Sequence, residues 1–185
     1  MRVIGGKFKS RRLKTLPGTR TRPTSDPLRE TLFNILGARI VDAVFADCYA
    51  GSGAVGIEAL SRGAAKVYFL ESYGPAAALI RGNLSSLGIH DGFEILPTDV
   101  LRSLERLVRR NVVLNFAFLD PPYTAVEEYE RTLTYLGNGK LLACDAEIIA
   151  EHTRRTVLPE RIGCLVCARR LRQGDSALTF YRVVE

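Results

Sequence analysis

Short apolar runs alternate with amphipathic segments along most of this 185-residue chain. The apolar runs predict buried strands at residues 44–47, 66–71, 93–96, 116–120 and 147–150. Between them, apolar residues recur every three or four positions, which predicts helices near residues 54–61, 75–87, 101–108 and 125–136. Repeated strand–helix units are typical of a parallel sheet with helices on both faces.

The two ends of the chain depart from this alternation. Asp26 can cap a helix that has Pro27 at its first position and an apolar stripe up to Leu36. Near the C-terminus, strand-like residues 162–171 and 177–184 flank a polar turn and predict an antiparallel hairpin. We therefore expect an α/β fold with a mostly parallel, seven-stranded, Rossmann-like sheet that ends in this hairpin.

The composition is that of a globular protein with an ample core, because 46% of the residues are hydrophobic and 25% are charged. No apolar run approaches the roughly 20 residues of a membrane span, and the first seven residues have no apolar signal core. With four cysteines that fit a reducing compartment, these features favour the cytoplasm. Cys164 and Cys167 have C-x-x-C spacing, but positions three apart in a strand face opposite sides. We expect them to pack in the core and predict no metal site.

Positive charge is concentrated at the N-terminus. Residues 1–29 hold nine basic groups and one acid, whereas the other 156 residues hold 17 basic and 19 acidic groups. A basic segment on a near-neutral body is typical of a protein that binds a polyanion. Val3 and Leu13 indicate that this segment folds, as a pair of strands. We predict a basic arm over residues 1–24 and a second unit over residues 25–185. The nucleic-acid contacts expected in the arm are Arg2, Lys7, Lys9, Arg11, Arg12, Lys14, Arg20 and Arg22.

Polar residues follow four predicted strands, and ligands bind at such strand ends in open parallel sheets. The first group contains the glycine pattern G-x-G-x-x-G at residues 51–56, and Glu71 follows 20 residues after Gly51. Glycines let the backbone approach a ligand closely, and a carboxylate there can hold two ribose hydroxyls. The pattern predicts an adenosine-containing cofactor, and both a nicotinamide dinucleotide and S-adenosylmethionine satisfy it. Asp99 can accept from an adenine amino group, cap the next helix, or do both.

A rigid corner follows the fourth strand, with the sequence Asp120-Pro121-Pro122-Tyr123. Two prolines fix the backbone, so the carboxylate, the neighbouring carbonyls and the ring are held in place. This arrangement suits a flat, amino-bearing ring that stacks on Tyr123 and donates to Asp120. Transfer of a methyl group to an exocyclic amine needs such orientation. A dehydrogenase needs an acid–base group instead, and neither His90 nor His152 lies in a motif typical of one.

With these residues in view, the chain resembles the RsmD family of bacterial 16S ribosomal RNA guanine-N2 methyltransferases over nearly its whole length. The resemblance rests on residues 2–6 (RVIGG), 22–24 followed by 29–34, 47–64 and 120–123 (DPPY). It implies a methyltransferase fold that binds S-adenosylmethionine, a guanine site at Asp120 to Tyr123, and an RNA-gripping basic arm. One departure is Ser72-Tyr73-Gly74 after Glu71, where the family often has a second acid.

The resemblance also implies the residues around the cofactor. They lie in the glycine loop, at the ends of the second and third strands, and in the segment before the first helix. The expected set is Asp47, Ala50, Gly51, Ser52, Gly53, Glu71, Asp99, Thr24 and Arg29. The implied partner is 16S rRNA or an assembly intermediate of the small ribosomal subunit, and nothing in the sequence demands more than a monomer.

Other functions remain open from the residues. A DNA adenine-N6 methyltransferase uses the same corner chemistry, because its target is also a ring amine. A protein glutamine methyltransferase is more distant, since it usually carries Asn at the position of Asp120. A non-catalytic nucleic-acid-binding or assembly protein on a methyltransferase fold is the alternative from another class.

Overall fold

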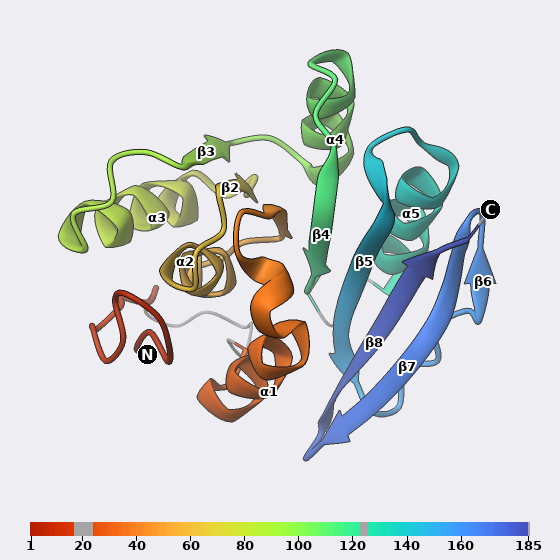
Figure 1. Cartoon of the computed structure of the whole chain (residues 1–185), viewed down its shortest axis with the longest axis horizontal. Helices are drawn as coiled ribbons and strands as arrows, with labels where there is room; N and C mark the ends of the chain where they lie inside the picture. Colours follow the sequence, from red (N-terminus) through yellow and green to blue (C-terminus); the bar gives the residue numbers. More distant parts are fainter. Residues whose placement is uncertain (17–23, 123–125, 185) are drawn as a thin grey trace.

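The computed structural model describes residues 1–16, 24–122 and 126–184, and it places eight strands of these residues in one sheet (Figure 1). They are β1 (Val44–Cys48), β2 (Lys66–Leu70), β3 (Phe93–Leu96), β4 (Leu114–Leu119), β5 (Leu142–Thr153), β6 (Arg161–Ile162), β7 (Leu165–Gln173) and β8 (Ser176–Val183). The order across the sheet is β3-β2-β1-β4-β5-β8-β7-β6. Strands β1 to β5 pair in parallel, and β8, β7 and β6 continue the sheet in antiparallel pairs. The predicted fold class is confirmed, and the eighth strand is the two-residue β6, which is too short to leave a periodic pattern.

The helices of the described residues connect these strands. They are α1 (Asp26–Leu36), α2 (Ala54–Ser61), α3 (Gly74–Ser86), α4 (Val100–Arg109) and α5 (Val126–Asn138), with the 3-10 turn η1 (Gly37–Ile40) after α1. Helix α1 has Pro27 in its first turn as expected, but its cap is Ser25, whose hydroxyl accepts the Leu28 amide. Asp26, the predicted cap, pairs with Arg29 at 3.0 Å instead. Every helix among the described residues is too short or too polar to cross a membrane.

The sheet is covered on both faces (Figure 1). Alternate residues of a strand face opposite sides, so Phe45, Phe69 and Phe118 pack in a cluster with the apolar stripes of α1, α2 and α3. The opposite face packs against α4 and α5 through a second cluster that includes Leu104 and Leu133. Helices on both faces leave the C-terminal ends of the parallel strands as an open rim, which is where a ligand can enter.

Residues 1–16 form a basic N-terminal segment that folds against the body of the protein. Its two halves run antiparallel and meet in a single bridge between Arg2 and Arg12, so the expected pair of strands is reduced to one bridge. Val3 and Leu13 are buried in the cluster beneath α1 and α2. The segment is therefore anchored to the sheet domain by its own apolar side chains.

Glu58 of α2 holds the beginning of this segment. Its carboxylate, which is fully buried, accepts the amides of Ile4 at 2.7 Å and Gly5 at 2.8 Å. The same carboxylate accepts Arg62 Nε at 2.8 Å. Hydrogen bonds to a charged acceptor are roughly twice as strong as neutral ones, so one buried side chain fixes the path of the N-terminal backbone.

Arg29 completes this buried cluster from α1. Its guanidinium is fully buried, donates to the carbonyls of Arg2 and Thr24, and lies 3.7 Å from Glu58 through Nε, which is an ion pair beyond hydrogen-bond range. Asp26 supplies a second carboxylate to the same guanidinium. Buried charges are tolerated only when paired and hydrogen-bonded, so Arg29, Glu58 and the N-terminal backbone depend on one another.

We expect Glu58→Ala to lower the free energy of unfolding by about 3–5 kcal/mol, because it removes the buried one of the two carboxylates that pair with Arg29 and leaves two backbone amides without their acceptor. Urea unfolding followed by circular dichroism measures the change. Glu30→Ala on the exposed side of α1 is the matched control and should change stability by less than about 0.5 kcal/mol. Equal stability of the two variants would contradict the anchoring role of Glu58.

Candidate active site

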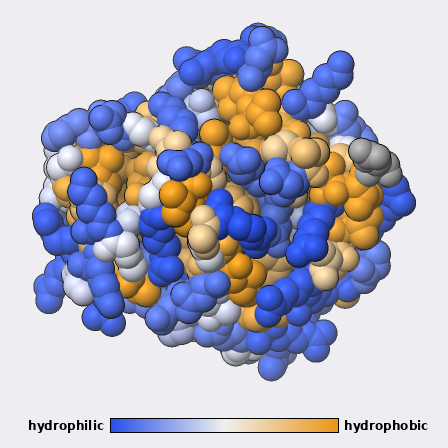
Figure 2. Space-filling view, viewed as in Figure 1, coloured by the Kyte–Doolittle hydropathy of each residue, from blue (hydrophilic) through white to orange (hydrophobic). Residues whose placement is uncertain are grey.

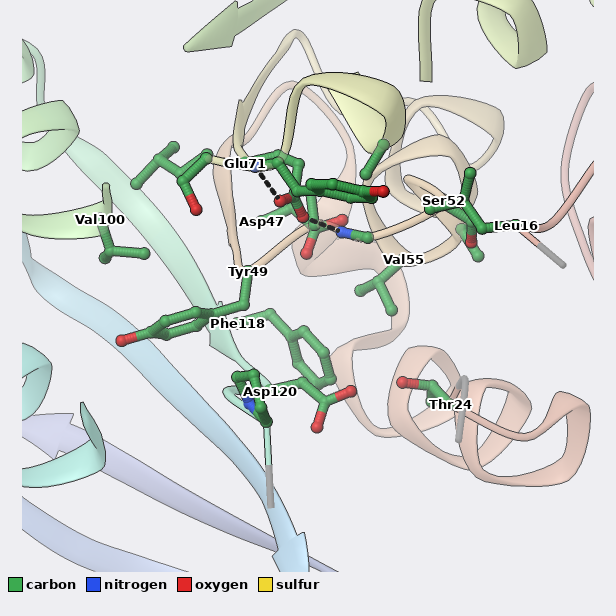
Figure 3. Close-up of a pocket in the computed structure, with 18 of the residues that line it drawn as sticks. Leu16, Thr24, Asp47, Tyr49, Ser52, Val55, Glu71, Val100, Phe118 and Asp120 are labelled. Atoms are coloured by element: carbon green, nitrogen blue, oxygen red, sulfur yellow. Dashed lines mark hydrogen bonds between the residues drawn. The ribbon is translucent and has the colours of Figure 1, made fainter. Parts of the chain in front are cut away.

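A cavity of about 540 Å³ opens at the C-terminal rim of the sheet (Figure 3). Strand-end residues and the loops after β1, β2 and β4 form most of its wall. Residues of the N-terminal segment and of the approach to α1 complete it from the other side, and they are Met1, Thr15, Leu16 and Thr24. The expected convergence of polar strand ends on one site is therefore present, and the N-terminal segment is part of the same cavity.

The loop between β1 and α2 bends sharply into this cavity. Tyr49, Gly51 and Gly53 all have positive φ, of 69°, 54° and 78°. Such conformations suit glycine, but they strain Tyr49, and strained residues cluster at functional sites. Gly56, the last glycine of the motif, lets α2 approach β2, since a Cβ there would lie 2.3 Å from the Phe69 ring.

Glu71 braces this loop rather than pointing freely at a ligand. Its carboxylate accepts the Gly51 amide at 2.7 Å and the Tyr73 amide at 2.8 Å (Figure 3). A carboxylate has about four acceptor positions, so it can still accept a ligand hydroxyl while it holds both amides. Glu71 lines the cavity, as the predicted contact with a ribose requires.

Asp47 is the penultimate residue of β1 and lies almost fully buried in the wall of the cavity. One of its oxygens accepts the Gly56 amide at 2.8 Å. Burial raises the pKa of Asp47 from its ordinary value of 3.8 to about 8, the Gly56 amide opposes this rise, and the charge of Glu71 adds to it. Near neutral pH the carboxyl of the unliganded protein is therefore mainly protonated.

Asp120 follows β4 and faces the cavity (Figure 3). Burial raises the pKa of Asp120 well above its usual range, and the charges of Glu151 and Asp47 raise it further. Pro121 is buried and Pro122 lines the cavity mouth. Pro121 therefore anchors the corner instead of contacting a ligand. Tyr123, the predicted stacking ring, lies outside the described residues.

Thr24 and Glu151 connect the approach to α1 with the sheet. The Thr24 hydroxyl donates to Glu151 Oε2 at 2.6 Å, and both side chains are buried. Thr24 lines the cavity, as predicted for a cofactor contact. Arg29, predicted beside it, instead lies in the buried cluster with Glu58 and is not among the described residues that line the cavity.

Some of the other predicted cofactor residues line the cavity, and one does not. Ala50, Gly51 and Ser52 line the cavity, whereas Gly53 turns the chain into α2 and packs against Ile80, 3.1 Å from where its Cβ would be. Asp99 also lines the cavity, and its Oδ1 accepts the Arg102 amide at 3.1 Å as the cap of α4. Both interpretations of Asp99 are therefore compatible with its position.

Several cavity residues were not predicted from the sequence. Tyr49 lies against the cavity, and its hydroxyl bonds Thr132 at 2.7 Å and Glu128 at 3.2 Å, both on α5. Val100 and Phe118 supply apolar wall. Tyr49 lies in the sequence between the predicted Asp47 and Ala50. Its position just after a predicted strand could therefore have identified it as a cavity residue. The tertiary contacts with α5 left no local pattern.

The basic residues predicted to bind nucleic acid lie on the surface of the N-terminal segment. Arg2, Lys7, Lys9, Arg11, Arg12 and Lys14 are all exposed. Arg11 also donates to the Ser86 carbonyl at 3.0 Å, which ties the segment to the end of α3. Arg20 and Arg22 lie outside the described residues. Arg2 and Lys14 adjoin Met1 and Thr15, which line the cavity, whereas the Lys7 amide donates to the carbonyl of Ser61 at the far end of α2.

Comparison with known proteins reveals similarity over almost the entire chain. Residues 1–182 match the model of a family described as conserved hypothetical protein 95. Ribosomal RNA small subunit methyltransferase D of Escherichia coli (strain K12) is 35% identical over 159 residues, which cover 86% of this chain and 78% of that protein. YlbH of Bacillus subtilis (strain 168) is 36% identical over 98% of both chains. The structure of yhhF from Escherichia coli matches with a TM-score of 0.85 at 32% identity, covering 99% of this chain and 97% of that one.

The raised pKa of Asp47 predicts how stability depends on pH in the protein without ligand. Between the unfolded pKa near 4 and the folded pKa of about 8, the native state binds more protons than the unfolded chain. The free energy of unfolding should therefore fall as pH rises through this window, and Asp47→Asn should weaken the fall by on the order of 2 kcal/mol between pH 5 and 8.

Urea unfolding at several pH values measures this dependence. Part of the fall should persist in Asp47→Asn, because the pKa of Asp120 is raised as well. Asp91→Asn in the exposed loop before β3 is the control and should behave like the wild type. A variant of Asp47 with the full wild-type dependence would show that this carboxyl is charged in the native state.

Proposed function

The chain belongs to the family described as conserved hypothetical protein 95, that of ribosomal RNA small subunit methyltransferase D, and from this we propose that it transfers a methyl group from S-adenosylmethionine to the exocyclic N2 of a guanine in 16S ribosomal RNA. The observation that carries the proposal is the position of Asp120. It places a carboxyl on a proline-stiffened corner, in the same cavity as the glycine loop.

The cavity fits the chemistry of S-adenosylmethionine, which supplies an electrophilic methyl group on a sulfonium cation. Asp47 and Glu71 provide carboxylates for its cationic and hydroxyl groups, and Ala50 to Ser52 let the backbone approach closely. Asp99 and Val100 at the start of α4 provide a polar and an apolar contact for the adenine ring. A group of carboxylates withdrawn from water favours a cation over a neutral ligand.

Asp120 would orient the target amine. Its carboxylate accepts one amine hydrogen, a corner carbonyl accepts another, and the nitrogen lone pair then points at the methyl carbon. The N–C bond forms as the S–C bond breaks, and the methylated nitrogen loses one proton. A carboxyl with a raised pKa is suited to receive that proton. Orientation of this kind contributes several kcal/mol of barrier reduction.

The target base must leave its stack to reach this corner. Enzymes that act on ring atoms use single strands or flip the base, because a stacked base hides its edge from the reactive carbon. The exposed cations of the N-terminal segment then hold the phosphates beside the cavity mouth. We expect a loop or an incompletely assembled region of the small subunit as substrate.

Transfer of tritiated methyl groups to small ribosomal subunits from a strain lacking the enzyme tests this function. Label recovered as N2-methylguanosine is the expected result. Label recovered as N6-methyladenosine, or preferential labelling of duplex DNA, would overturn the assignment of the base or the nucleic acid. Absence of label from free rRNA and from subunits, with cofactor binding shown by calorimetry, would favour a non-catalytic binding protein.

We expect Asp120→Ala to lower kcat by roughly 10²-fold or more, because it removes both the orienting acceptor and the proton acceptor. Cofactor affinity should stay within about threefold of the wild type, since Asp47, Glu71 and the glycine loop are retained. Glu130→Gln on the exposed side of α5 is the control and should keep wild-type turnover. Equal loss of cofactor binding and turnover in Asp120→Ala would contradict the separate roles of Asp120 and the glycine loop.

A further inference from the structure

A second concentration of positive charge lies in the C-terminal part of the chain. Residues 153–184 hold seven arginines and only two acids, Glu160 and Asp175. The acidic middle of the sequence masks this excess when charge is summed over everything after residue 29. The arginines are Arg154, Arg155, Arg161, Arg169, Arg170, Arg172 and Arg182.

Strand pairing brings part of this charge to the rim that carries the active site. Ala150 of β5 pairs with Leu119, one residue before Asp120, and β5 continues in register with β8 to Thr153. Strand β7 returns beside β8, so Arg172 pairs with Ala177 and lies slightly beyond the level of Asp120. Three strand spacings separate β4 from β7, which is about 14 Å.

The hairpin and the N-terminal segment lie on opposite sides of the end of β4 (Figure 1). In the same view, the lower edge of the molecule, toward which β4 and β5 run and where the hairpin ends, is mainly hydrophilic (Figure 2). The N-terminal segment and the end of the hairpin, which both carry basic residues, thus lie on either side of the end of β4.

Five of these arginines are exposed without a carboxylate partner among the described residues, and three of the five lie toward the rim. The other two, Arg161 and Arg182, are both in register with Val166 of β7, away from the rim. Arg154 lies 3.6 Å from Asp175, and Arg170 pairs with Glu160 and donates to the Leu158 carbonyl. By contrast, no hydrogen bond or ion pair within the described residues involves the side chains of Arg155, Arg169 and Arg172, all of which are exposed. We name these three the hairpin arginines.

Protection of a sheet edge explains only part of this arrangement. Beyond Cys167, whose amide donates to the Glu160 carbonyl at 2.8 Å, no strand of the described residues pairs with the outer side of β7. Charged side chains discourage such edges from pairing with other chains. This accounts for charge on Arg169 and Arg172. It does not account for Arg155, which lies in the turn after β5 and joins the same rim.

We infer that the hairpin arginines are a second binding surface for the RNA backbone, on the side of the Asp120 corner opposite the N-terminal segment. This inference rests on the proposed RNA substrate. Phosphate contacts fix the register of a nucleic acid without reading its sequence. Contacts on both sides of the corner would hold the RNA across the cavity mouth, so that one extruded base enters while its flanking phosphates stay bound.

The test replaces all three hairpin arginines with glutamine in the full-length protein. We expect affinity for 16S rRNA to fall about tenfold or more at moderate salt, and the slope of log K against log salt to decrease by roughly 2–3. The KM for RNA should rise in parallel, while affinity for S-adenosylmethionine and turnover at saturating RNA stay near wild type. Replacement by lysine should retain most of the affinity, because the charge is kept.

The matched control removes three arginines from the opposite edge of the sheet. Arg106, Arg109 and Arg110 lie at the end of α4 and are exposed. Their replacement by glutamine changes net charge equally and should alter RNA affinity by no more than about threefold. An equal loss in both triple variants would assign the effect to net charge and overturn the inference.

Two further outcomes separate this inference from the proposed function. Wild-type methylation together with unchanged RNA affinity and salt slope in the hairpin variant would overturn the second surface alone. Reduced RNA affinity in the hairpin variant, in a protein that methylates no guanine, would support the surface while contradicting the proposed reaction.

Discussion

The enclosure of three carboxyl groups at neighbouring strand ends is the constraint on which the site depends. Asp47 and Glu151 lie near the C-terminal ends of β1 and β5, Asp120 follows β4, and Thr24 holds Glu151 from the approach to α1. Burial raises the pKa of Asp47 to about 8 and that of Asp120 well above its usual range, and neighbouring carboxylates raise both further. The unliganded protein therefore retains protons at this site. A cationic ligand relieves the same repulsion. The fold thus forms a site that is electrostatically incomplete without a proton or a cation.

The N-terminal segment closes this site because buried charges bind it to the helices. Glu58 and Arg29 have few alternative partners inside the protein, so the backbone of residues 2–5 is held by the same interactions that neutralise them. The segment then contributes Met1, Thr15 and Leu16 to the cavity wall and exposes its cations on the surface of the same segment. Cofactor cavity and proposed RNA surface are therefore built from one continuous piece of chain.

Much of this arrangement was predictable from the sequence, because parallel strands bring their C-terminal ends to one rim. Hydrophobic periodicity located the strands that carry Asp47, Glu71 and Asp120. Sequence patterns did not predict positions that tertiary contacts decide. Arg29, predicted beside the cofactor, instead lies in a buried ion pair with Glu58. Ser25, and not Asp26, caps α1. Tyr49 gained its place through contacts with α5. The positive charge of the C-terminal hairpin was not predicted, because the net charge was summed over all residues after 29 and the acidic residues of that region cancel it.

The central claim is that these carboxyl groups form a cation site for the cofactor, and proton release on binding tests it most directly. Isothermal titration calorimetry near pH 7, in buffers of different ionisation enthalpy, counts the protons released with S-adenosylmethionine and with S-adenosylhomocysteine. The two ligands share their amino acid and adenosine parts and differ in the sulfonium charge. Greater proton release with the sulfonium ligand is the predicted result. Equal release, or none with either ligand, would contradict the claim.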